Sequence, residues 1–267
     1  MSESLLHVVI DEAAAVAWLR LNRPAKKNAM SSGLLTELIA AFRSLRDDDR
    51  IRCIVTTGTG DAYSAGLDLH DLKAKWARKR AWDESGGLTE LIRLVRASPK
   101  VTIAAVNGHC LGGGLALVNA HDLAVASERA TFGLPEILRG SFGNVATATL
   151  FQAGIPPKKA FYLQLTGRTM SGAEAERVGL VSTVVAHDHL EAFVRELGAH
   201  IGRQSSVALE HAKIAAYLEM HQDFDTALRT DELVAHRMRL YTDPLADVEG
   251  YLRARSSELA ADRLSGS

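Results

Sequence analysis

The sequence predicts an α/β fold followed by a helical C-terminal part. Short apolar runs typical of buried strands alternate with amphipathic helices through the first half of the chain. This alternation favours an α/β core. Two of the strands lead through glycine-bearing turns into helices. Beyond about Pro156 the strand patterns almost vanish, and helical periodicity continues towards the C-terminus.

Each expected element follows from its local pattern. Ser31 or Ser32 caps a helix whose apolar residues recur every three or four positions up to Leu45, and residues 47–49 end it. A basic, poorly patterned stretch at residues 76–82 is expected to be a mobile surface segment. The predicted strands are residues 5–10 and 14–21 (paired as a hairpin), 51–56, 101–106 and 123–126. The predicted C-terminal helices are residues 157–165, 173–178, 189–201, 206–220 and 224–240.

Composition narrows the class of protein. The 267 residues suffice for one large domain, or for a core with a smaller appendage. The formal net charge of −1 gives no general attraction to nucleic acid or to an anionic membrane. We expect no leader and no membrane span, because no charged N-terminal region and no sufficiently long apolar run is present. We therefore expect a soluble, cytoplasmic protein that needs a local basic patch to bind a phosphate-bearing ligand.

The two cysteines, Cys53 and Cys110, have no C-x-x-C partner, and no histidines stand at metal-ligand spacing. We expect free, buried thiols in a reducing compartment. Neither a disulfide framework nor a metal site is expected.

Two glycine-bearing turns, residues 63–69 and 107–115, each connect a strand to a helix. Unpaired N–H groups at such a helix start can receive an anion, and glycine lets a ligand atom approach the backbone. Tight strand–helix packing explains one such turn equally well. A nucleotide-binding turn does not fit, because the spacing matches neither G-x-G-x-x-G nor G-x-x-x-x-G-K-[ST].

Taken together, the two turns resemble the signature of the crotonase (enoyl-CoA hydratase/isomerase) superfamily. The resemblance rests on Ala65-Gly66-Leu67-Asp68 and on Asn107-Gly108 followed by Gly112-Gly113-Gly114. It extends over nearly the whole chain, through residues 21–24, 28–29, 132–136, 165–167 and 179–181.

The resemblance implies a fold and a ligand. Residues 1–200 are expected to form a core of repeated ββα units that carries the acyl-CoA site. Residues 201–267 are expected to form a helical oligomerisation region, giving a homotrimer or a dimer of trimers. The implied partner is an acyl-CoA thioester, with coenzyme A as part of the substrate and no separate cofactor. No nucleic acid or membrane partner is expected.

The resemblance also assigns residues. It places an oxyanion hole for a thioester enolate on the backbone N–H groups of Leu67 and Gly113. For Lys26 and Lys27, the alternative to a binding role is that they are solvated surface lysines. For Asp68, the alternative is a structural carboxylate at the start of a helix. Coenzyme A and the acyl group are expected along the remaining binding positions: Ala25, Lys26, Lys27, Ala65, Gly66, Asp68, Gly112, Ala116 and Asn144.

The acid–base residues depart from the hydratase pattern. Hydratases of this superfamily use two glutamates, and the first of these positions is Ala116 here. The second is retained as Glu136, whose apolar neighbours are expected to raise its pKa. The alternative for Glu136 is a surface ion pair with Arg139.

One carboxylate suits proton transfer between two carbons, so we expect double-bond isomerisation of an enoyl-CoA. Hydration or a retro-aldol hydratase–lyase step is the alternative, because residues 29–31, 107–110 and 143–144 resemble hydroxycinnamoyl-CoA hydratase–lyases. The tyrosines that hold the phenol in those enzymes are missing at Leu72 and at residues 232–234. A non-catalytic acyl-CoA-binding protein is the remaining alternative. His109 and the pair His121–Asp122 are expected to be structural.

Overall fold

The structure is a computed structural model that describes residues 4–77, 87–246, 248–253 and 255. The chain divides into two compact units, Met1–Arg203 and Gln204–Ser267. The expected surface segment at residues 76–82 lies mostly outside the described residues, since only its first two positions are described, in a helix.

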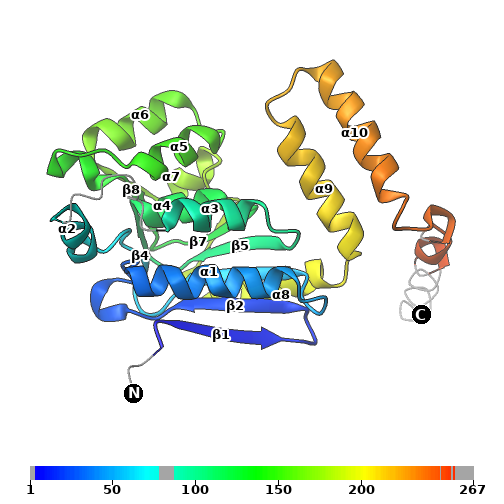
Figure 1. The fold of residues 1–267 in the computed structure, drawn as a ribbon, viewed down its shortest axis with the longest axis horizontal. Coiled ribbons are helices and arrows are strands. Elements are labelled where there is room, and N and C mark those ends of the chain that lie inside the picture. The colour runs from blue at the N-terminus through cyan, green and yellow to red at the C-terminus, as the bar shows by residue number, and fades with distance from the viewer. Residues whose placement is uncertain (1–3, 78–86, 247, 254, 256–267) are drawn as a thin grey trace, which may run out of the picture. The chain divides into compact units, whose positions relative to one another are not determined.

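The first unit is built on a six-stranded sheet in the order β1-β2-β3-β5-β7-β10 (Figure 1). Strands β1 and β2 form the expected antiparallel hairpin, and the other neighbours are parallel. The strands are β1 (Leu6–Asp11), β2 (Val16–Leu21), β3 (Cys53–Gly58), β5 (Val101–Val106), β7 (Leu123–Ser127) and β10 (Thr183–Val185).

A second sheet, in the order β4-β6-β8-β9, consists of three-residue strands that the sequence did not predict. Each of the first three follows a strand of the large sheet, so that the expected ββα unit recurs along the chain. Its members are β4 (Ala62–Ser64), β6 (His109–Leu111), β8 (Thr131–Gly133) and β9 (Thr169–Ser171).

Helices flank the sheets and confirm the predicted periodicity. Ser31 caps α1 by accepting a hydrogen bond from the Leu34 N–H, and Asp47 is the C-cap residue. The helices of the first unit are α1 (Ser32–Arg46), α2 (Leu69–Ala77), α3 (Leu88–Arg96), α4 (Gly113–Ala120), α5 (Asn144–Gln152), α6 (Pro157–Thr166), α7 (Gly172–Arg177) and α8 (Leu190–Gly202), with 3₁₀ turns η1 (Pro24–Lys26), η3 (Pro135–Arg139) and η4 (His187–His189).

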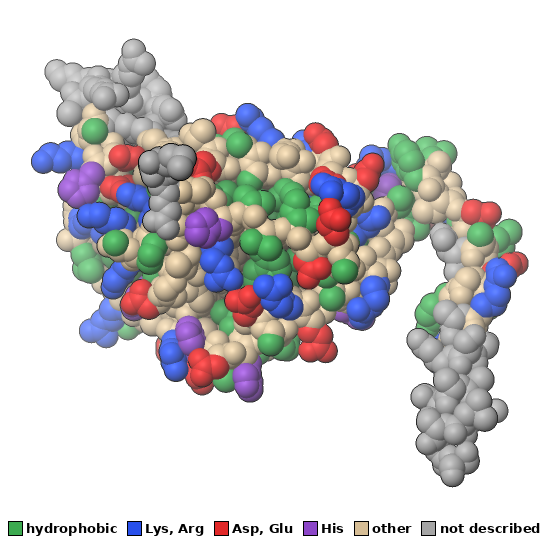
Figure 2. Space-filling view, turned by 90° about the horizontal axis from the view of Figure 1, so that it is seen from below, with side chains coloured by type: hydrophobic (Ala, Val, Ile, Leu, Met, Phe, Trp, Pro, Cys, Tyr) green, Lys and Arg blue, Asp and Glu red, His purple; other side chains and the backbone are tan. Residues whose placement is uncertain are grey.

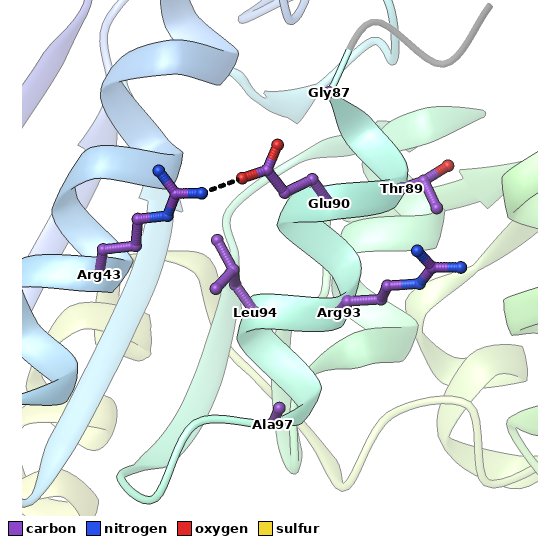
Figure 3. A pocket seen from close by; sticks show the side chains of 7 residues that line it. All are labelled: Arg43, Gly87, Thr89, Glu90, Arg93, Leu94 and Ala97. Atoms are coloured by element: carbon purple, nitrogen blue, oxygen red, sulfur yellow. Dashed lines mark hydrogen bonds and ion pairs between the residues drawn. The ribbon is translucent and has the colours of Figure 1, made fainter. Parts of the chain in front are cut away.

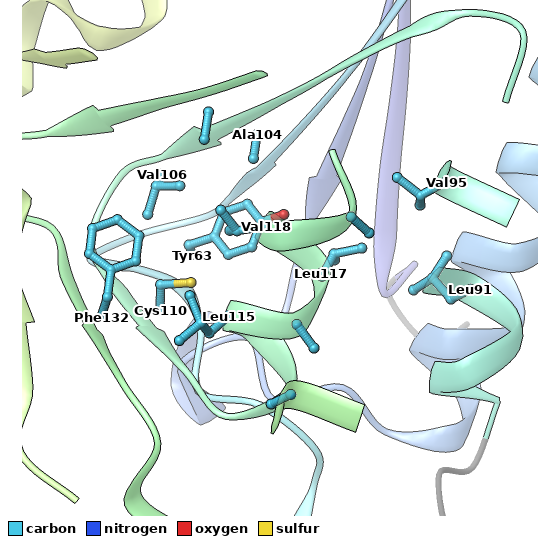
Figure 4. Close-up of a cluster of buried hydrophobic side chains, with 14 of the residues drawn as sticks. Tyr63, Leu91, Val95, Ala104, Val106, Cys110, Leu115, Leu117, Val118 and Phe132 are labelled. Atoms are coloured by element: carbon cyan, nitrogen blue, oxygen red, sulfur yellow. The ribbon is translucent and has the colours of Figure 1, made fainter. Parts of the chain in front are cut away.

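The core lies between the large sheet and the helices α1, α3 and α4. It includes Leu19 and Ile54 from the sheet. Figure 4 shows Leu115 and Leu117, which α4 contributes to it. Helix α8 packs against β2, β3, β5 and β7. Helix α4 begins within the second glycine-bearing turn and is buried in the core, so its packing positions that turn.

The second unit contains α9 (Ser206–Glu219) and α10 (Phe224–Met238), which pack against each other. Among the described residues no helix is long and apolar enough to cross a membrane. Cys53 and Cys110 are buried thiols, as expected. On the face in Figure 2, basic and acidic side chains of the described residues are interspersed.

Candidate active site

The N–H group of Leu67 is directed by a short parallel bridge to Met30. Met30 donates to the Gly66 carbonyl at 2.7 Å and accepts from the Asp68 N–H at 3.0 Å. Because both neighbours of Leu67 bond to Met30, the N–H of Leu67 itself points to the other side. Within the described part of the chain it has no acceptor.

The second free N–H group belongs to Gly113, the first residue of α4, where no intrahelical acceptor exists. The two groups lie close together. A Cβ added to Gly66 would be 3.0 Å from the Gly113 nitrogen, and one added to Gly113 would be 3.4 Å from the Leu67 nitrogen. Gly66 also has a φ of +93°, which favours glycine. The glycines therefore bring two unpaired donors together at one helix start.

Glu136 stands beside these donors in η3. A Cβ on Gly112 would lie 2.3 Å from its Oε1 atom, and one on Gly143 would lie 3.4 Å from its Oε2 atom. Oε2 is buried and has no hydrogen-bond partner within the described structure. Burial raises the pKa of the Glu136 carboxyl, although its own backbone N–H and the charge of Arg139 act in the opposite direction. The alternative interpretation of Glu136, a surface ion pair with Arg139, is not found among the described residues.

A cavity of about 470 Å³ joins Glu136 to the two donors. Its wall is mostly apolar, with polar side chains at Lys73, Arg139, Ser141 and Asn144. The apolar lining residues are Ala65, Leu67, Leu69, Leu72, Leu88, Phe142, Val145 and Ala146. An apolar pocket with a few convergent polar groups and one carboxyl of raised pKa is the usual form of a small-molecule site. It can hold a carbonyl oxygen on the donors while Glu136 exchanges a proton with the ligand.

Another hollow lies between α1 and α3 (Figure 3). There Arg43 Nη2 meets Glu90 Oε1 at 2.6 Å, and the two charges offset each other on an exposed surface. The carboxylate in this hollow is paired with an arginine, whereas the Glu136 carboxyl in the cavity keeps an unpaired buried oxygen.

The chain matches the model of the enoyl-CoA hydratase/isomerase family over residues 11–249. The chain belongs to this family. It is 35% identical to the hydroxycinnamoyl-CoA hydratase-lyase of Pseudomonas fluorescens over 216 residues, covering 77% of this chain and 76% of that protein. It is 31% identical to the 2,3-dehydroadipyl-CoA hydratase of Escherichia coli over 235 residues, covering 88% and 89%.

The fold is that of the same family. The crystal structure of an enoyl-CoA hydratase from Mycobacterium smegmatis superposes with a TM-score of 0.87 at 30% identity, covering 94% of this chain and 97% of that one. The crotonase resemblance expected from the two glycine turns is thereby confirmed, and the family acts on acyl-CoA thioesters.

Several predicted residues of this crotonase gather at the cavity. Leu67, Gly113, Glu136, Ala65 and Asn144 all line it. Gly66 and Gly112 adjoin it through the close approaches described above.

The turn at Ala25, Lys26 and Lys27 lies next to the cavity without lining it. All three residues are exposed, and the Lys27 carbonyl accepts a hydrogen bond of 2.8 Å from the Ala65 N–H. The turn is fixed by Asn28, whose Nδ2 donates to the Ala62 carbonyl at 2.7 Å. The turn that carries the two lysines is therefore attached to Ala65, a residue of the cavity wall.

Two predicted binding residues lie elsewhere. Ala116 is fully buried within α4 and does not line the cavity. Asp68 faces Arg23, with Oδ2 at 2.9 Å from Nη1, and its Oδ1 accepts from the His70 N–H. Burial would raise the pKa of Asp68, but these hydrogen bonds outweigh it and hold the pKa below its usual value. Asp68 thus anchors the segment that follows Leu67, the structural role weighed as its alternative.

The two histidine predictions hold. His109 Nδ1 lies 2.9 Å from Thr131 Oγ1, between β6 and β8, and His109 does not line the cavity. His121 is the C-cap residue of α4.

Much of the cavity wall was not predicted. Leu69 and Leu88 come from helices α2 and α3, and Phe142 comes from the loop before α5. Their one sequence signal is apolar character, which they share with ordinary core residues.

Proposed function

We propose that this crotonase is an enoyl-CoA isomerase, which moves a double bond within a bound enoyl thioester. One observation carries the proposal. Glu136 is the only carboxylate among the described residues that line the cavity, and it lies beside two free N–H donors. A single carboxylate can take a proton from one carbon and return it to another.

In the proposed reaction the thioester oxygen accepts hydrogen bonds from the Leu67 and Gly113 N–H groups. Ionised Glu136 removes a proton from C2, next to the thioester carbonyl, and the released electron pair delocalises onto the oxygen. Each donor contributes about 3–4 kcal/mol to stabilising this enolate. Protonated Glu136 then returns the proton to C4. The C3–C4 double bond becomes a C2–C3 double bond, and the enzyme regains its starting state.

Hydration is the closest alternative. Adding water across the double bond is easiest with one carboxylate to activate the water and another to deliver the proton to C2. At the position of the first carboxylate this chain has Ala116, whose methyl group is buried in α4. This favours isomerisation over hydration.

A hydratase–lyase reaction is a further candidate, supported by the 35% identity to the hydroxycinnamoyl-CoA hydratase-lyase. In that reaction Glu136 would accept and donate protons in turn. Leu72 stands in the cavity wall where a phenol-binding tyrosine is expected, and its apolar side chain favours an apolar acyl group.

The remaining parts of the proposal concern binding. Lys26 and Lys27 are proposed to meet phosphate groups of coenzyme A, and Asn144 the acyl group. The reaction we propose needs no other cofactor. The proposed assembly is a homotrimer or a dimer of trimers, supported by exposed apolar side chains in the second unit: Leu218, Met220, Phe224, Leu228 and Leu233.

The test is Glu136→Gln, assayed on a panel of 2-enoyl- and 3-enoyl-CoA thioesters with products identified by NMR. Isomerisation should fall by about 10²–10⁴-fold. Glu128→Gln, the same change at an exposed position outside the cavity, should leave turnover intact. Turnover that survives Glu136→Gln would refute the assigned role. Calorimetric binding of acyl-CoAs by the wild type without any product would instead support the non-catalytic alternative.

A further inference from the structure

A chain of buried hydrogen bonds connects three elements behind the cavity. The Tyr63 hydroxyl lies 2.8 Å from Thr56 Oγ1. Thr56 Oγ1 lies 2.9 Å from His121 Nε2, and His121 Nδ1 lies 2.7 Å from the Leu117 carbonyl oxygen. Tyr63 and Thr56 have no exposed surface, and His121 is 7% exposed. The chain does not line the cavity, so it has no part in the chemistry proposed above.

The direction of each bond follows from its acceptor. The Leu117 carbonyl can only accept, so His121 Nδ1 donates to it. With a neutral ring, Nε2 then accepts from the Thr56 hydroxyl, and the Thr56 oxygen accepts from Tyr63. Burial raises the pKa of Tyr63, which keeps its hydroxyl protonated as this direction requires.

This chain joins the two segments that carry the free N–H donors. Tyr63 lies in β4, four residues before Leu67. His121 is the C-cap residue of α4, whose first residue is Gly113. Thr56, in β3, bridges the two. Figure 4 shows Tyr63 within the same buried cluster as Leu117 and Val118 of α4.

The same segments also touch at the other end of α4. A Cβ on Gly114 would lie 2.6 Å from the Ser64 carbonyl oxygen, so the first turn of the helix lies directly against β4. A helix of eight residues is about 12 Å long. Helix α4 also packs against α3, α5 and β6, and the hydrogen-bond chain adds a directional attachment to β4 at its C-terminal end.

We propose that Tyr63, Thr56 and His121 are positioning residues that set the angle of α4 and thereby hold the Gly113 N–H in register with the Leu67 N–H. The inference rests on the proposed role of these donors in binding a thioester oxygen. The three side chains act through the backbone and do not touch the substrate.

The test is Thr56→Val, which keeps the shape of the side chain and removes the hydroxyl that joins the two rings. Thr57→Val is the matched control. Thr57 is the next residue of the same strand, so its side chain lies on the opposite face, in a hollow it shares with His187 and Leu190. Thr56→Ser retains the hydroxyl and serves as the rescue variant.

The readout is the infrared carbonyl stretch of a bound acyl-CoA with a ¹³C-labelled thioester carbon, which reports hydrogen bonding to the oxygen. The wild type should shift this band to lower wavenumber relative to free ligand, and Thr56→Val should shift it less. Its kcat should fall about tenfold, with KM changed by no more than about twofold. Thr56→Ser and Thr57→Val should match the wild type in both measurements.

The outcomes separate the two claims. A wild-type band shift that is unchanged in Thr56→Val would overturn the positioning role while leaving the donors in place. A lack of any band shift in the wild type would overturn the proposed oxyanion hole itself. Because the band position reports only folded, ligand-bound protein, partial unfolding of a variant lowers its amplitude and leaves its position interpretable.

Discussion

The Oε1 atom of Glu136 occupies the space that a side chain on Gly112 would need, since a Cβ there would stand 2.3 Å from this oxygen. Gly112 also has a φ of +54°, in the left-handed region. One glycine thus serves two purposes. It starts the helix that presents the Gly113 N–H, and it lets the carboxyl of η3 approach that helix.

Gly112→Ala should therefore displace Glu136 and strain the backbone. We expect kcat/KM to fall by about 10²-fold, as for a misplaced catalytic group, and the free energy of unfolding to fall by about 1–3 kcal/mol. Gly179→Ala is the control, because Gly179 has a φ of +77° and no atom within 4 Å of an added Cβ. It should lose stability without losing turnover. Wild-type turnover in Gly112→Ala would show that the close approach is unnecessary.

The raised pKa of Glu136 predicts the pH dependence of activity. Since the ionised carboxylate removes the first proton, kcat/KM should rise with pH through the pKa of this group in the free enzyme. The midpoint should lie above the ordinary glutamate value of about 4.3. It is measured from isomerisation rates at a series of pH values. An acid limb at or below the ordinary value would contradict the burial argument.

The same shift predicts the pH dependence of stability. A carboxyl with a higher pKa in the folded state binds more protons when folded, so stability falls as pH rises from the unfolded pKa through the folded one. Glu136→Gln removes this loss. Urea denaturation should find the variant more stable than the wild type at about pH 7, with the difference shrinking near the unfolded pKa of about 4.3. A less stable variant at neutral pH would contradict this prediction.

Replacing Lys26 and Lys27 is predicted to weaken substrate binding without slowing the chemical step. Replacing Lys26 and Lys27 together by Met should raise KM for acyl-CoA and leave kcat unchanged, because the phosphates lie far from the reacting carbons. The change in KM should shrink at high salt and vanish for an acyl-pantetheine substrate that lacks phosphates. Lys158 and Lys159, exposed on α6, provide the matched double variant. An equal KM increase with acyl-pantetheine would show that the lysines do not act through phosphate.

The sequence predicted the periodic elements well, because caps and apolar spacing are local signals. Ser31 begins α1 as expected. The strand expected at residues 51–56 begins later, at Cys53, since the Ile51 N–H closes a turn onto the Asp48 carbonyl. The local pattern predicts a loop in place of the short strand His109–Leu111, because the pairing of this strand with β4 and β8 involves residues distant in sequence.

The sequence predicted the backbone donors of the candidate site but not most of the side chains that form the cavity wall. Glycine spacing is visible in a sequence, so Leu67 and Gly113 could be named. Leu69 and Leu88 could not, because an apolar residue facing a cavity has the same pattern as one facing the core. Ala116 was expected to touch the substrate from its place in the motif, whereas the turn of α4 directs it into the core.

The central claim is that Glu136 and the two N–H donors generate a thioester enolate. Deuterium exchange at C2 of a saturated acyl-CoA in D₂O, followed by mass spectrometry, tests it most directly because no double bond or added water is required. The wild type should exchange the C2 protons, and Glu136→Gln should lose this exchange while still binding the ligand. Absence of exchange in the wild type, or equal exchange in Glu136→Gln, would contradict the claim.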